Sequence, residues 1–95
     1  MTGTTRSSAD LDPRRRKALF RSWHRGTREM DLILGGFADD HIGDLSDAEM
    51  DVYEVILDQL DPLLFKWFSG EEPVPAEYDT PLYRKILDHR RHRQF

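Results

Sequence analysis

The feature that most constrains the fold of this chain is a series of helix start and stop signals at short intervals. An Asp or Thr followed directly by proline occurs three times, at Asp12–Pro13, Asp61–Pro62 and Thr80–Pro81. Such pairs favour helix starts, because the first helical position leaves its N–H unpaired and proline has none. Glycine suits the left-handed position just beyond a helix end, as at Gly26, and Gly43 and Gly70 also mark expected helix ends. The chain is therefore divided into short helical segments.

Apolar residues between these signals recur at helical spacing, and no stretch shows the alternation of a strand. Ser46 and Glu49 form a capping-box pattern, and Thr27 can cap the preceding helix. We expect helices over residues 13–24, 28–42, 47–60, 62–69 and from 81 onward, with a loop over 71–79. The predicted fold is all-α, a compact five-helix bundle with short loops.

Three local expectations follow from the same patterns. Gly35 and Gly36 lie inside the second helix, where each costs about 1 kcal/mol relative to alanine, and close approach of a neighbouring backbone would explain them. The third helix should end with Leu60 on its apolar face. Asp61 should cap the fourth helix, which is apolar nearly all round and should be deeply buried.

Length and composition bound the domain organisation. The chain has 95 residues, 38% apolar, which suits one domain over residues 11–95 with a disordered tail over 1–10 and a fraying basic end. The longest uncharged apolar run, Leu32–Ala38, is too short to span a bilayer, and residues 1–12 lack the apolar region of a secretory signal. We expect no membrane insertion. The absence of cysteine fits a reducing compartment such as the cytoplasm.

Charge is segregated along the chain. Residues 1–25 carry seven Lys or Arg and two Asp, residues 26–80 two Arg or Lys and fifteen Asp or Glu, and residues 81–95 five Lys or Arg and one Asp. The basic clusters Arg14–Lys17 and His89–Arg93 could contact nucleic acid, or they could be solvated helix faces. Because the acidic middle repels phosphate, we do not expect nucleic-acid binding.

No catalytic or metal site can be assembled from the sequence. The serines lie in the tail, on helix surfaces or at helix ends, and no glycine-rich phosphate loop follows a strand. His89 and His92 are three residues apart beside Asp88, and His41 follows two aspartates. Structural zinc usually takes four ligands, and nothing supplies a closed set, so we predict no metal site and no enzyme.

The junction over residues 24–31 is dense in Arg, His, Glu and Asp. Its structural interpretation is strong, because Gly26 ends one helix, Thr27 caps the next, and Glu29 complements the helix dipole. From the residues alone that interpretation is favoured. A corner of this composition would also suit protein docking, because Arg is enriched at binding hot spots and glycine permits close approach.

At this junction the sequence resembles the succinate dehydrogenase assembly factor family, or flavinators, whose hallmark is an Arg-Gly-x-x-Glu motif between the first two helices. Here the motif is Arg25, Gly26 and Glu29. Residues 30–35 are similar to the family's second helix, and residues 61–67 to its Asp-x-x-Leu-(Tyr/Phe)-x-Trp segment. The landmarks cover residues 14–70, and the set as a whole is specific where the short motif alone would be weak.

The resemblance implies a five-helix assembly factor of bacterial type, which binds the flavoprotein subunit of succinate dehydrogenase and also of fumarate reductase. It implies that the factor promotes covalent attachment of FAD to a histidine of that client. FAD then belongs to the client, this chain binds no cofactor stably, and it is a monomer when free.

Carried over residue by residue, the resemblance assigns partner docking to Arg25, Gly26 and Glu29, with Arg28 and Asp31 as flanking contacts. Arg25 and Glu29 would bond to the client, and Gly26 would permit close packing, where a side chain would clash or disturb the turn. Two alternatives stay open, an antitoxin-like or nucleic-acid-binding regulator that uses the basic ends, and an interaction module with another client.

Overall fold

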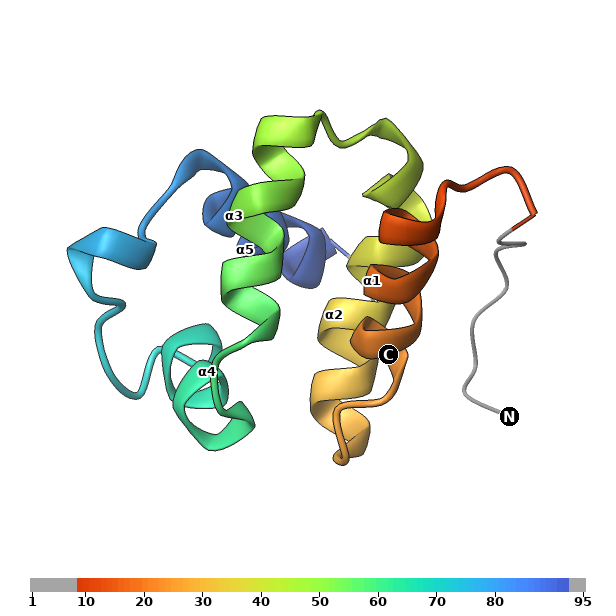
Figure 1. Ribbon diagram of the computed structural model, residues 1–95. Helices are drawn as coiled ribbons and strands as arrows, with labels where there is room; N and C mark the ends of the chain where they lie inside the picture. Colours follow the sequence, from red (N-terminus) through yellow and green to blue (C-terminus); the bar gives the residue numbers. More distant parts are fainter. Residues whose placement is uncertain (1–8, 93–95) are drawn as a thin grey trace.

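The computed structural model describes residues 9–92, and these contain five α-helices and no strand (Figure 1). The α-helices are α1 Pro13–Trp23, α2 Arg28–His41, α3 Asp47–Leu57, α4 Asp61–Phe68 and α5 Pro81–His92, with 3-10 turns η1 Ile42–Asp44 and η2 Ala76–Tyr78. The all-α, five-helix prediction is confirmed. Most of the tail expected over residues 1–10, and residues 93–95 of the basic end, lie outside the described residues, whereas His89–His92 are helical.

Local signals set most helix starts as predicted. Proline occupies the first turn of α1, and the Thr27 hydroxyl caps α2 by accepting from the Met30 N–H at 3.4 Å. The capping box of α3 is complete, because Ser46 Oγ accepts from the Glu49 N–H at 3.1 Å and Glu49 Oε1 accepts from the Ser46 N–H at 3.0 Å. These bonds satisfy helix N–H groups that have no partner within their own helix.

Two predictions at the α3–α4 turn were wrong. α3 ends at Leu57 rather than at residue 60, and Leu60 is 74% exposed instead of facing the core. Asp61 does not cap α4, because the helix begins at Asp61 itself and Leu60 takes the cap position. The Asp61 carboxylate instead pairs with Arg25 from the α1–α2 junction. A partner 36 residues away has overridden the local capping signal.

The prediction of close approach at the α2 glycines is confirmed at Gly35, but the neighbour is a side chain and not the backbone that was expected. A Cβ on Gly35 would lie 2.3 Å from Cδ2 of Trp23 on α1, so the indole ring occupies that space. The same indole donates from Nε1 to Oδ1 of the buried Asp39 at 3.0 Å. α1 and α2 are thereby packed closely side by side (Figure 1).

The core is shared by all five helices. Its largest fully buried side chains include Tyr53, Tyr83 and Phe37. The Tyr53 hydroxyl lies 2.6 Å from the Ser22 hydroxyl, which donates to the Ala18 carbonyl at 2.7 Å. Burial raises the pKa of Tyr53 well above its ordinary value, so the phenol stays neutral and bonded inside the core.

The prediction that α4 is deeply buried was wrong for one side of this helix. Leu64, Trp67 and Phe68 are buried, but Leu63 and Phe65 are 38% and 37% exposed. α4 is eight residues long and packs against the bundle through one face only. Its other apolar face is therefore available to form a surface feature. No helix in the described part of the chain is long and apolar enough to cross a membrane.

Candidate docking site at the α1–α2 corner

The predicted docking residues lie at the corner where α1 turns into α2, at the lower end of this helix pair in Figure 1. Gly26 adopts φ +101°, a left-handed conformation that residues with a Cβ rarely take. A Cβ built there would meet no atom within 4 Å. In the isolated chain a side chain at Gly26 would therefore strain the backbone without clashing. The space beside the Gly26 Cα is open to solvent.

Arg25 turns inward, and its guanidinium binds the α3–α4 turn. Its side chain is only 9% exposed, and Nε donates to Asp61 Oδ1 at 2.8 Å. The two terminal nitrogens donate to the carbonyls of Leu57 at 2.6 Å and Gln59 at 2.9 Å. The Leu57 and Gln59 carbonyls belong to the end of α3 and the turn beyond it, so Arg25 acts as a clamp between the corner and that turn. These partners within the chain accept the hydrogen bonds of the guanidinium N–H groups, which the sequence analysis expected to bond to a client.

Asp31 supports the corner from the first turn of α2. One of its carboxylate oxygens accepts the Arg25 backbone N–H at 2.6 Å. This bond closes the left-handed turn over Gly26, and it holds the Arg25 backbone in the position from which the side chain reaches Asp61. Asp31 is half-buried, and it lies near the α2 N-terminus, where negative charge is favourable. Its role within the chain is to position Arg25.

Arg28 and Glu29 point the other way, toward solvent. Both are exposed, and neither makes a hydrogen bond or ion pair through its side chain to another residue that the structure describes. The corner is thus divided into an inward half, Arg25 and Asp31, and an outward half, Gly26, Arg28 and Glu29. The sequence shows that these five residues lie at one helix junction, but helical periodicity does not tell which of them face the core and which face solvent.

A groove runs beside the outward half of the corner. One wall comes from Thr27, Glu29 and Met30, the other from Asp61, Pro62 and Phe65 of α4, and the groove encloses about 350 Å³ between largely apolar walls. Sequence reasoning missed the α4 wall. The signal that could have identified it is that α4 is apolar nearly all round. A short helix packed on a small bundle buries only one face, so part of its apolar surface must stay exposed.

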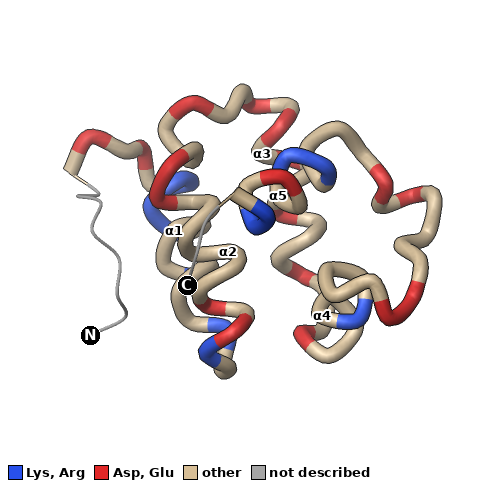
Figure 2. The backbone as a smooth tube through the Cα atoms, turned by 180° about the vertical axis from the view of Figure 1, so that it is seen from behind, with Lys and Arg blue, Asp and Glu red and all other residues tan. Residues whose placement is uncertain are grey.

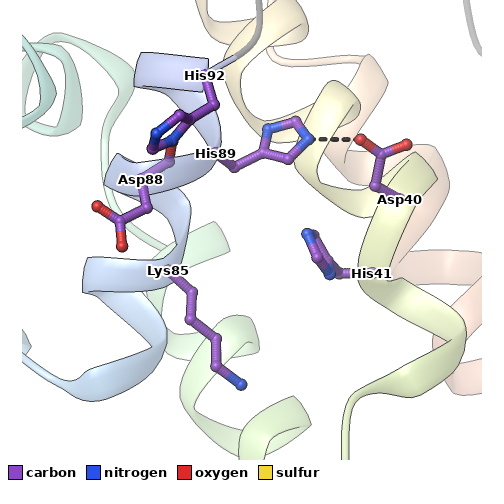
Figure 3. A pocket seen from close by; sticks show the side chains of 6 residues that line it. All are labelled: Asp40, His41, Lys85, Asp88, His89 and His92. Atoms are coloured by element: carbon purple, nitrogen blue, oxygen red, sulfur yellow. Dashed lines mark hydrogen bonds and ion pairs between the residues drawn. The ribbon is translucent and has the colours of Figure 1, made fainter.

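A second hollow, of about 630 Å³, lies between α2 and α5 and is lined by charged and imidazole side chains, Asp40, His41, Lys85, Asp88, His89 and His92 (Figure 3). His89 Nε2 lies 2.6 Å from Asp40 Oδ2, and the His41 and His89 rings meet edge-on with centroids 5.5 Å apart. The described residues include no group of three or more His, Cys, Asp or Glu arranged to hold a metal ion.

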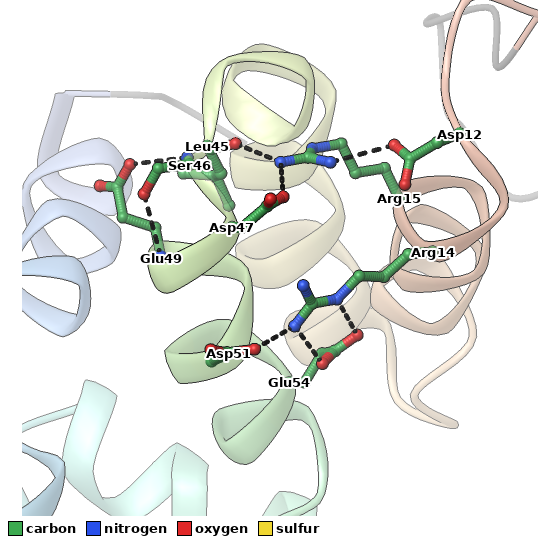
Figure 4. A network of polar contacts seen from close by, with 9 residues as sticks. All are labelled: Asp12, Arg14, Arg15, Leu45, Ser46, Asp47, Glu49, Asp51 and Glu54. Atoms are coloured by element: carbon green, nitrogen blue, oxygen red, sulfur yellow. Dashed lines mark hydrogen bonds and ion pairs between the residues drawn. The ribbon is translucent and has the colours of Figure 1, made fainter.

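Arg14 and Arg15 of the first basic cluster are engaged in internal ion pairs. Arg14 binds Glu54 at 2.9 and 2.8 Å and also Asp51, and Arg15 bonds to Asp12 and Asp47 (Figure 4). These partners hold the pKa of Glu54 and of Asp12 below their ordinary values. Figure 2 shows Lys and Arg positions scattered over α1, the corner, α4 and α5, with Asp and Glu positions between them.

Comparison with known proteins gives a consistent set of relatives. Residues 16–90 match the family described as "Flavinator of succinate dehydrogenase". The chain is 38% identical over 85 residues to the "FAD assembly factor SdhE" of Acetobacter pasteurianus, covering 90% of this chain and 78% of that protein. It is 33% identical over 81 residues to the mitochondrial "Succinate dehydrogenase assembly factor 2" of Dictyostelium discoideum, covering 85% of this chain.

The chain spans little more than half the length of two of its mitochondrial relatives. It covers 57% of the Dictyostelium protein and 57% of the corresponding protein of Candida glabrata, to which it is 30% identical. No solved structure matches the chain.

Proposed function

This chain belongs to the flavinator family of succinate dehydrogenase, and we propose from that premise that it is an assembly factor for the flavoprotein subunit of that enzyme. In this proposal it binds the subunit and promotes covalent attachment of FAD, with fumarate reductase as a second client. The observation that carries the proposal is the family match over residues 16–90, which includes the corner, α2, α3 and α4 and most of α1 and α5.

The proposed mechanism is selective binding rather than catalysis by this chain. FAD and the histidine that receives it belong to the client, so this chain is not an enzyme and holds no cofactor of its own. A binding partner shifts a conformational equilibrium only by the difference between its affinities for the two states. To turn a 1:99 population into 99:1, the factor must prefer the reaction-competent client by about 10⁴-fold.

We assign direct client contact to the outward half of the corner and support of that contact to the inward half. Arg28 and Glu29 carry charges without internal partners among the described residues, so a client can bind them without breaking existing bonds. Arg25 and Asp31 fix the shape of the corner. Gly26 serves the turn through its positive φ, and its open outer side leaves room for a client backbone.

The nucleic-acid alternative is disfavoured because several arginines already form ion pairs with carboxylates of this chain. Arg14, Arg15, Arg21 and Arg84 each pair with at least one carboxylate of the chain. Binding to phosphate would require these bonds to be exchanged on a protein of net charge −4. We propose that the factor works as a monomer in the cytoplasm, and the absence of cysteine fits such a reducing compartment.

The test is covalent flavin on the client in a strain that lacks this chain. In-gel fluorescence of the succinate dehydrogenase flavoprotein subunit should be lost on deletion and restored by the native chain. Glu29→Ala should restore it poorly, whereas the matched surface variant Glu77→Ala on η2 should restore it fully. Circular dichroism checks that both variants are folded. Full covalent flavin without any form of the chain would contradict the proposed function.

A further inference from the structure

We infer that the groove between the corner and α4 receives a client segment that presents a large apolar side chain next to a Lys or Arg. The inference rests on the proposed function and goes further, because it identifies the chemistry of the client surface that is recognised. Two independent properties of the groove carry it: an apolar wall left exposed by the described residues, and a carboxylate at the rim that pairs with none of them.

The apolar wall is contributed mainly by α4. Pro62 and Phe65 line the groove opposite Met30, and Leu60 and Leu63 are exposed close by in the chain. Three of the five large apolar side chains exposed in the described residues thus fall within six consecutive positions, and of these three Phe65 lines the groove itself. Clustered exposure of this kind is uncommon outside binding surfaces, and buried apolar anchors at the centre of an interface carry most of its affinity.

The other two exposed apolar side chains do not form such a cluster. Phe20 on α1 is 62% exposed, but its ring stacks on His24 with centroids 3.8 Å apart. Val55 on α3 is exposed singly and is not part of the groove lining. Single exposed apolar residues are normal on a protein surface. The contrast favours a binding role for Phe65, which is exposed and lines the groove, and it makes Val55 a suitable control position.

The charge at the rim determines what should lie beside the apolar anchor. Two carboxylates border the groove, and Asp61 is already neutralised by the Arg25 guanidinium. Glu29 has no hydrogen-bonding or ionic partner within the described part of the chain. Residues 26–80, which supply both walls, contain fifteen Asp or Glu against two Lys or Arg. An opposite charge on the client complements this rim, since like charges would repel it.

The Arg25 clamp explains why the groove is formed before the client arrives. One wall belongs to the start of α2 and the other to α4, and Arg25 joins them through Asp61 and the carbonyls of Leu57 and Gln59. A groove held open in its binding geometry avoids the entropy cost of ordering its walls. Arg25 is therefore a positioning residue for this site.

The test titrates the purified succinate dehydrogenase flavoprotein subunit with the full-length chain by isothermal titration calorimetry. Phe65→Ser and Glu29→Lys should each weaken binding by about ten-fold or more. The matched controls Val55→Ser and Glu77→Lys remove an apolar group and reverse a charge outside the groove, and each should change affinity by less than about two-fold. In a salt series, Glu29→Gln should bind with a weaker dependence on ionic strength than the native chain.

The outcomes separate the inference from the proposed function. If the native chain restores covalent flavin while Phe65→Ser and Glu29→Lys bind as tightly as the native chain, the groove inference is wrong and the function stands. If the native chain neither binds the subunit nor restores flavin, the proposed function itself fails. Sedimentation that shows a dimer abolished by Phe65→Ser, with client binding unchanged, would assign the groove to a second copy and overturn the inference. Glu29 is exposed, so its variants keep the test valid if Phe65→Ser fails to fold.

Discussion

An arginine links each end of α1 to the rest of the bundle, but the two arginines differ in how far their ion pairs are buried. At the start of the helix, Arg14 is 32% exposed and pairs with carboxylates of α3 that face water (Figure 4). Just beyond its end, Arg25 is 9% exposed and binds Asp61, which is 15% exposed, together with two backbone carbonyls. Exposed pairs are screened and contribute little, whereas breaking a buried pair leaves uncompensated charge.

Arginine therefore serves as a surface contact at the start of α1 and as an internal clamp just beyond its end. The family motif contains the clamp, which holds together the two walls of the groove. We therefore expect substitutions of the inward residue Arg25 to affect stability and client binding together, and substitutions at the start of α1 to affect neither strongly.

The largest effect should come from Arg25→Met. This variant keeps much of the side-chain volume but leaves the Asp61 carboxylate and two carbonyls without their donor. We expect the free energy of unfolding to fall by about 3 kcal/mol, measured by urea denaturation followed by circular dichroism. Arg28→Met, an exposed neighbour with no internal partner in the described chain, should cost less than about 0.5 kcal/mol. Equal losses in the two variants would refute the clamp.

Gly26→Ala should have the next largest effect on stability. A Cβ at φ +101° is strained although nothing lies within 4 Å of it, so we expect a loss of about 1–2 kcal/mol. The same denaturation experiment measures it, with Gly43→Ala as a control glycine for which no positive φ occurs. A Gly26→Ala variant as stable as the native chain would show that the left-handed turn is not required.

Arg14→Met should lose less stability than Arg25→Met, and the loss should shrink as salt is added. Arg14 lies among carboxylates that water also reaches, so ions in solution screen its pairs. Urea midpoints at low and at high sodium chloride measure the effect. A loss as large as that of Arg25→Met and insensitive to salt would remove the distinction between the two ends of α1.

The smallest effect should appear as a pH dependence at the start of α1. The Arg14 guanidinium beside Glu54 holds the pKa of that carboxyl below its ordinary value of 4.5. A carboxyl with a lowered folded-state pKa stabilises the fold above its unfolded-state pKa, and this contribution disappears as the pH falls through the lowered pKa. Acid titration of stability should therefore show a smaller decline below about pH 4.5 in Glu54→Gln than in the native chain. Identical declines would show that the pair does not contribute.

Much of the fold was predictable because its signals are local. The capping box of Ser46 and Glu49 and the left-handed glycine at the corner are set by residues within a few positions of one another. Apolar spacing then identifies which face of each helix enters the core. The same local reading, joined to the family resemblance, brought the five corner residues together as one candidate site.

The errors concern partners that are distant in sequence. Asp61 pairs with Arg25 instead of capping its own helix, Leu60 faces solvent, and Trp23 rather than a backbone fills the space beside Gly35. Periodicity gives the face of a helix but not the residue that will meet it from another element. Propensity signals of about 1 kcal/mol are readily overridden by such tertiary contacts.

The sequence by itself determined the helices, their order and the position of the Arg25-to-Glu29 corner, since caps, glycines and apolar spacing act over a few residues. Only the tertiary structure decided that Arg25 faces inward while Glu29 faces out, and that α4 lies where its apolar face completes a groove. The physical reason is that burial depends on where the helices meet. A charged side chain that packing removes from water must bind an internal partner, as Arg25 does. One that packing leaves in water, such as Glu29, stays available to a client.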